Sequence, residues 1–118
     1  MFARDVFNLP VGRNLDDLVE IALFDAEREH LNFTSNALLR RNGKVRSPRP
    51  FSSSSEFLGD LIEQLKFKKI PFSIKYSSSD SVGFCVIVNG VLFSSEKLPE
   101  ALSKAVGANF IQNGKVIR

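Results

Sequence analysis

The chain has 118 residues, of which 43% are hydrophobic and 25% charged, and its formal net charge is +3. A domain of this length buries about 65% of its unfolded-chain surface, enough for a core without disulfides or metals. No apolar run approaches the roughly 20 residues of a membrane span, and the N-terminus lacks the layout of a signal peptide. The single cysteine, Cys85, excludes an internal disulfide framework, so we expect a cytoplasmic protein.

The first strong pattern is helical. Apolar residues at positions 15, 18, 19, 22, 23 and 26 share one helical stripe, which predicts a helix with Asn14 as its N-cap. Asp16 and Asp17 fall in its first turn. Glu20 and Asp25 fall on the opposite face, which we expect to be solvated, with an acidic partner-binding face as the alternative.

Charge changes sign after this helix. Residues 1–30 carry three basic and seven acidic side chains, whereas residues 31–50 carry five basic side chains and no acid. Arginine pairs bidentately with phosphate or carboxylate, so this basic run is the candidate anion- or partner-binding site. Its members are Arg40, Arg41, Lys44, Arg46 and Arg49.

The basic residues lie in a segment without helical period. Residues 31–52 contain Asn42-Gly43, Pro48 and Pro50, so they are expected to form a long connection with a turn at 42–44. Residues 37–41 could form a short helix or strand within it. Connections of this length are usually functional or mobile.

A second helix is predicted after the connection. Ser53 followed by Glu56 is a capping-box pattern, and an apolar stripe over residues 57–65 ends before Pro71. Lysines at positions 66, 68 and 69 would lie at the end of this helix, where positive charge complements the helix dipole. That position is a sufficient structural explanation for the lysine cluster.

Three strands are predicted next. Residues 72–76 alternate apolar and polar side chains, a serine-rich loop follows, and residues 82–88 are apolar on both faces. Asn89-Gly90 predicts a two-residue hairpin turn into a third antiparallel strand. Because residues 84–88 are apolar on both faces, we expect cover on both, from helices or from a second copy of the chain. Cys85 is expected to be a small buried hydrophobe.

The remaining pattern is a helix and a tail. Leu98-Pro99 predicts a helix start and Gly107 a C-cap, which leaves residues 108–118 as a terminal hairpin or tail. We therefore predict one α+β domain over residues 1–118, an α/β/α-type sandwich with an antiparallel sheet of three strands or slightly more. Its element order is helix, long connection, helix, three strands and helix.

Three short motifs resemble a known family. They are Gly12-Arg13-Asn14-Leu15-Asp16-Asp17, Pro50-Phe51-Ser52 and Leu98-Pro99-Glu100-Ala101. Over residues 10–107 the chain resembles the small bacteriophage and prophage accessory proteins that carry the phage ABA sandwich domain, with departures at positions 14, 51 and 98. The resemblance implies a phage origin, a location in the host cytoplasm and a sandwich fold. It implies no catalytic residues.

A second resemblance concerns the double-stranded RNA-binding domain, which has the same order of helix, three antiparallel strands and helix. Gln64, Lys97 and Lys104 suit that reading. Such domains carry a lysine cluster at the start of the last helix, where this chain has Leu98-Pro99-Glu100. A module for double-stranded RNA or DNA is therefore the alternative hypothesis.

The sequence contains no pattern of an enzyme. His30 is the single histidine and has no nucleophile motif beside it, no glycine-rich phosphate loop exists, and one histidine with one cysteine cannot form a metal site. Of the possible metal sites, the sequence leaves only those formed by carboxylates. We expect a non-enzymatic protein without a cofactor that inhibits a host factor or sequesters an anionic, nucleotide-like ligand through the basic connection. The competing hypotheses are an apolar face for homo-oligomerisation or host-protein docking, and a solvated basic loop that aids solubility.

Overall fold

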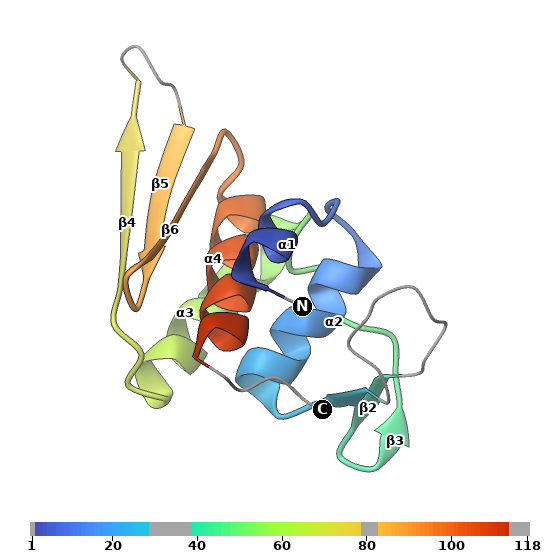
Figure 1. The fold of residues 1–118 in the computed structure, drawn as a ribbon. Coiled ribbons are helices and arrows are strands. Elements are labelled where there is room, and N and C mark those ends of the chain that lie inside the picture. Colours follow the sequence, from blue (N-terminus) through green and yellow to red (C-terminus); the bar gives the residue numbers. More distant parts are fainter. Residues whose placement is uncertain (1, 29–38, 79–82, 114–118) are drawn as a thin grey trace.

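The computed structural model describes residues 2–28, 39–78 and 83–113, which form four α-helices and two antiparallel three-stranded sheets (Figure 1). The predicted α+β class and the order of the main helices and strands are confirmed. The elements are α1 (Ala3–Phe7), α2 (Arg13–Phe24), β1 (Glu27–Arg28), β2 (Leu39–Arg41), β3 (Lys44–Val45), the 3₁₀-helix η1 (Ser55–Phe57), α3 (Leu58–Phe67), β4 (Phe72–Ser77), β5 (Gly83–Val88), β6 (Val91–Ser95) and α4 (Leu98–Gln112).

Two Asn-Gly turns set the hairpins. In the larger sheet, Asn89 and Gly90 have φ angles of 48° and 87°, and Val88 pairs with Val91 across the turn, as predicted. The same turn chemistry joins β2 to β3, where the φ angles of Asn42 and Gly43 are 55° and 77°. Both residues tolerate the positive φ that such a turn requires. The basic connection therefore contains an ordered hairpin, whereas residues 29–38 lie outside the described part of the chain.

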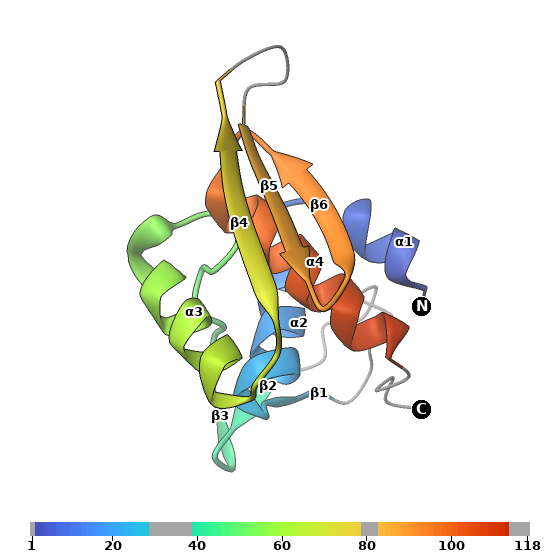
Figure 2. The same cartoon turned by 90° about the vertical axis from the view of Figure 1, so that its left-hand side faces the viewer.

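Helices cover one face of the β4–β5–β6 sheet (Figures 1 and 2). Val86 and Val88 on β5 are buried beneath α4, while Cys85 and Ile87, which alternate with them, are half-buried on the other face. The expected cover of both faces by helices is not found among the described residues, and Cys85 is not fully buried. The reason is that the central strand is flanked on this face by polar side chains as well as by the apolar Leu92 of β6. Its neighbours present polar residues outward beside it, namely Ser73, Lys75 and Ser94.

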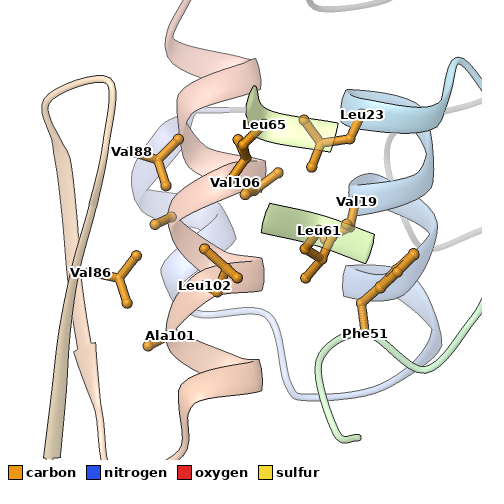
Figure 3. Close-up of a cluster of buried hydrophobic side chains, with 11 residues drawn as sticks. Val19, Leu23, Phe51, Leu61, Leu65, Val86, Val88, Ala101, Leu102 and Val106 are labelled. Atoms are coloured by element: carbon orange, nitrogen blue, oxygen red, sulfur yellow. The ribbon is translucent and has the colours of Figure 1, made fainter. Parts of the chain in front are cut away.

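The main core fills the space between this sheet and the helices (Figure 3). Val86 and Val88 face Leu102 and Val106 of α4, and α2 and α3 complete the cluster behind them. Each leucine buried in this way stabilises the fold by about 1.5–3 kcal/mol relative to an exposed one. The other core residues of α2, α3 and the connection are Val19, Leu23, Leu61, Leu65 and Phe51.

The helix starts differ in detail from the prediction. Gly12, with a φ of 147°, is the N-cap of α2, so Asn14 lies inside the first turn rather than at the cap. Glycine is favoured here because this φ is strained for residues with a side chain. Before α3, the Ser54 hydroxyl accepts a hydrogen bond from the Glu56 backbone N–H at 3.2 Å, so Ser54 caps η1 in place of Ser53.

The predicted end of the last helix is wrong. α4 continues through Gly107 to Gln112, so residues 108–112 are helical and not part of a terminal hairpin, and residues 114–118 lie outside the description. A Cβ on Gly107 would lie 2.7 Å from Leu18 Cδ2 and 3.1 Å from Val6 Cγ1. The glycine therefore allows α4 to approach α1 and α2 closely; it does not end the helix.

Candidate anion-binding site

The basic connection is anchored to α2 by a buried carboxylate. Glu20 is fully buried, so the predicted solvated position is wrong for this residue. Its Oε2 accepts hydrogen bonds from Arg41 Nη1 at 3.0 Å and from the backbone N–H of Arg49 at 3.1 Å. Its Oε1 accepts one from Arg49 Nη2 at 2.6 Å. Because charge-assisted pairs of this kind fix geometry as well as charge, Glu20 ties the hairpin to the helix through Arg41 and the segment after the hairpin through Arg49.

Arg49 is also held by aromatic rings. Its guanidinium carbon lies 4.2 Å from the ring centroid of Phe24 and 4.8 Å from that of Phe51. The two rings are stacked, with centroids 5.4 Å apart and planes 4° from parallel. Contact of a guanidinium with ring faces is favourable by about 1 kcal/mol or more where the site is partly desolvated. The side chain of Arg49 therefore holds the connection against α2 by contacts with both Glu20 and these rings.

The first-turn acids of α2 also face inward. Asp16 Oδ1 accepts a hydrogen bond from the backbone N–H of Ser52 at 2.7 Å, and the Ser52 hydroxyl accepts one from Gly12 N–H at 3.1 Å. Asp17 pairs with Arg28 Nε at 3.5 Å, and both side chains are buried. Burial raises the pKa of the Asp16 and Asp17 carboxyls, against the lowering effects of Ser52 and Arg28 respectively. Asp16 and Glu20 therefore hold the connection, whereas Asp17 holds β1 through Arg28.

These contacts divide the five predicted site residues into two groups. Arg41 and Arg49 are paired with Glu20 and so are not displayed for a ligand. Arg40, Lys44 and Arg46 are exposed on the hairpin. Alternation along β2 separates the two arginines of that strand, because Leu39 and Arg41 face the helix and Arg40 faces away. The structure therefore leaves three of the five cations exposed, with Arg40 on one face of the hairpin and Lys44, the cross-strand partner of Arg41, on the other.

A hollow of about 630 Å³ lies beside the hairpin, with carboxylates as well as Arg40 at its rim. One of them, Asp25, pairs with Lys68 Nζ at 3.1 Å. This contact ties the lysine-rich end of α3 to the end of α2, and the end of α3 and the hairpin lie on either side of α2 at the lower end of the molecule in Figure 1. Sequence reasoning treated the two basic clusters separately and missed this. The hollow is lined by Asp25, Glu27, Arg40, Asn42, Gly43 and Val45.

Residues that suited the double-stranded RNA reading make internal contacts. Lys104 Nζ donates to the Phe7 carbonyl at 2.9 Å and lies 3.3 Å from Glu100 Oε2. Gln64 Nε2 donates to the Leu23 carbonyl at 2.7 Å. The Ser95 hydroxyl, which donates to Glu100, is the main cause that lowers the pKa of that carboxyl. Two of the three candidate side chains for a duplex are therefore engaged within the fold, and Lys97 stands at the start of α4.

Other candidate chemistry is sparse in the described ranges. No three or more His, Cys, Asp or Glu side chains there are arranged to hold a metal ion, and none of the helices is long and apolar enough to cross a membrane. Cys85 is a free thiol, and His30 lies outside the described residues. Comparisons of the chain with protein-family models, curated proteins and solved structures found no match.

Proposed function

We propose that the protein is a non-enzymatic binding protein that captures an anionic, phosphate-bearing ligand with the exposed cations of the β2–β3 hairpin. The division of the basic connection is the observation that supports this most directly. Glu20 pairs with Arg41 and Arg49 and fixes the segment, while Arg40, Lys44 and Arg46 stay exposed. A hairpin that is already ordered loses little conformational entropy when a ligand binds, which favours affinity.

The wider biological role rests on the sequence motifs alone. We propose that the protein is a phage accessory protein in the host cytoplasm, which acts by sequestering its ligand or by inhibiting a host factor. Such a role needs affinity and no chemical step. An ordered hairpin with exposed cations suits this role, because arginine pairs bidentately with phosphate and carboxylate groups of a ligand.

The proposal is tested by a charge-reversed triple variant, Arg40→Glu, Lys44→Glu and Arg46→Glu. A control triple with the same change of net charge replaces the exposed residues Arg4, Lys75 and Lys97 by Glu. Calorimetric titration with inorganic polyphosphate should give a wild-type affinity that falls steeply between about 50 and 200 mM salt. The hairpin variant should lose binding and the control should keep most of it. Equal weakening of both would show a general charge effect and refute the hairpin site.

Arg49 should not be part of this test. Its replacement by Glu would place a second carboxylate against Glu20, whose Oε1 lies 2.6 Å from Arg49 Nη2. Two carboxylates in close contact repel one another, so the variant would disrupt the contacts by which Glu20 holds the connection. A loss of binding in this variant would then not show that Arg49 contacts the ligand.

Self-association is a second candidate function, favoured by one observation. Leu92 is 53% exposed on β6 and pairs in register with Ile87 of β5, on the sheet face that no described helix covers. The occupant that we propose for this face is a second copy of the chain. The pair is bordered by Ser73 on β4, so the association should be weak.

A further inference from the structure

Phe67 is the most exposed of the large hydrophobic side chains in the described part of the chain, with 79% of its surface accessible. It is the last residue of α3, between Lys66 and Lys68, with Lys69 following. Leaving a phenylalanine in water forgoes about 1.5–3 kcal/mol of burial. A single exposed hydrophobic residue is common, but this one stands among four consecutive residues of which three are lysines.

The surroundings of Phe67 connect it to the hairpin. Lys68 reaches Asp25, and Asp25 lines the same hollow as Arg40 and the Asn42-Gly43 turn. Asp25 is exposed in this pair, and Lys66 makes only a loose, exposed pair with Glu63 at 3.6 Å. Exposed pairs of this kind contribute at most about 1 kcal/mol and open readily to other anions. The end of the molecule formed by residues 66–69 and the β2–β3 hairpin, here the lower end, therefore combines two groups of cations with one exposed aromatic ring.

From this combination we infer that the lower end binds single-stranded nucleic acid. A base stacks on Phe67, Lys66 and Lys69 contact the phosphates beside it, and Arg40 and Lys44 contact phosphates further along the strand. The inference rests on the proposed anion-binding function and names its ligand class. Aromatic side chains within a positively charged surface are the usual means of binding single strands, because every base has a face that can stack.

The same features argue against other polyanions. A duplex keeps the faces of its bases stacked inside, so an exposed phenylalanine would gain nothing from it. An anionic membrane surface is bound by several apolar residues that enter together, whereas Val45 is the single other large hydrophobic residue above half exposure in the elements of this end. One ring with cations on both sides suits one unstacked base with phosphates on both sides.

The lack of tryptophan in the chain allows a direct test. Phe67→Trp introduces the sole tryptophan, whose emission can be excited apart from that of the single tyrosine, at an exposed site, so the fold should be unchanged. Titration with oligothymidylate of about 12 nucleotides should quench its emission along the binding curve, while inorganic polyphosphate should bind without quenching. The control Phe2→Trp also lies at an exposed phenylalanine, next to α1 on the opposite edge of the sheet from α3 (Figure 2). Its emission should not respond. Binding of the oligonucleotide without quenching at position 67 would overturn the inference.

Truncation of the ring separates stacking from general apolar contact. Phe67→Leu and Phe67→Ala should both weaken oligothymidylate binding by about 5- to 100-fold and leave polyphosphate affinity unchanged. If Leu restores full affinity, or if anionic vesicles compete for the wild type more strongly than the single strand does, the inference is wrong.

The outcomes also separate this inference from the proposed function. If polyphosphate binds through the hairpin and the single strand binds no tighter, this inference fails and the proposed function stands. If no polyanion binds, both fail.

Discussion

Glu20 determines where the cations of the hairpin can be. A fully buried carboxylate is strongly disfavoured unless it is paired and hydrogen-bonded, and here two arginines and a backbone N–H meet it. Arg41 and Arg49 are about a quarter exposed, so solvent reduces the strength of the pairs without removing the need for them. Because Glu20 holds Arg41 against the helix, alternation along β2 turns the neighbouring Arg40 outward.

Removing the charge of Glu20 should therefore destabilise the protein. We expect Glu20→Gln to lower the free energy of unfolding by about 3 kcal/mol, because two half-buried guanidinium groups lose their counter-charge. Asp25→Asn, at an exposed pair near the end of α2, should change it by about 0.5 kcal/mol or less. Urea denaturation of both variants provides the measurement. A Glu20→Gln variant as stable as the control would show that the anchor does not stabilise the fold.

Asp16 should give stability a distinct dependence on pH. Burial raises its pKa above the ordinary value of 3.8, so ionisation of this carboxyl disfavours the folded state. Below pH 3.8 it is protonated in both states. As pH rises from there through the folded pKa, the unfolded state ionises first and stability is lost.

The variant Asp16→Asn keeps an acceptor for the Ser52 N–H and removes the charge. It should be more stable than the wild type at about pH 7, and the difference should shrink as the pH falls towards 3.8. Urea denaturation across this range measures it. A difference that is constant with pH, or that grows in acid, would contradict the assigned cause.

At the scale of elements, the glycines of α3 and α4 form a matched pair. A Cβ at Gly59 meets nothing within 4 Å, whereas one at Gly107 would lie 2.7 Å from Leu18 Cδ2 in the core. Gly59→Ala should stabilise the protein by about 0.5 kcal/mol through helix propensity. Gly107→Ala should destabilise it by about 1 kcal/mol, because overpacking exceeds the same gain. Thermal unfolding of both variants checks the opposite signs, and a stabilised Gly107→Ala protein would refute the close approach of α4.

The elements that the sequence predicts are those fixed by local chemistry. The apolar stripe of α2 and the Asn89-Gly90 turn each specify their structure within a few residues, and both are confirmed. Gly107 was misassigned because a glycine can serve either as a helix stop or as a site of close packing, and only the position of Leu18 decides between them. Local patterns carry no information about that contact.

The candidate site shows the same limit. Helical period separates the two faces of α2 but cannot show that a distant hairpin covers the polar one, so Glu20 was assigned to solvent. Five cations were predicted as one group because their spacing does not show which of them face the helix. Once β2 is known to span Leu39–Arg41, its alternation assigns Arg41 inward and Arg40 outward.

At the scale of the whole molecule, the helices and the smaller sheet lie on one side of the β4–β5–β6 sheet (Figure 1). The other side presents Ile87 and Leu92 between polar neighbours. A sheet face of this kind is stable in water, as antiparallel sheets with one solvated face commonly are. It can also pair with an identical face, since a two-fold axis brings the same small apolar patch from each copy together.

Because the patch is small, we expect weak, concentration-dependent dimerisation through this face. Light scattering should detect dimers as the protein concentration rises towards about 100 µM, and Leu92→Glu should abolish them, since it would place two carboxylates in the contact. Val45→Glu changes a residue of nearly equal exposure, 54% against 53%, at the other sheet and should leave dimerisation intact. A wild-type protein that stays monomeric over this range would rule out a second copy as the occupant of the sheet face. Loss of dimers in both variants would instead indicate that added negative charge alone prevents association.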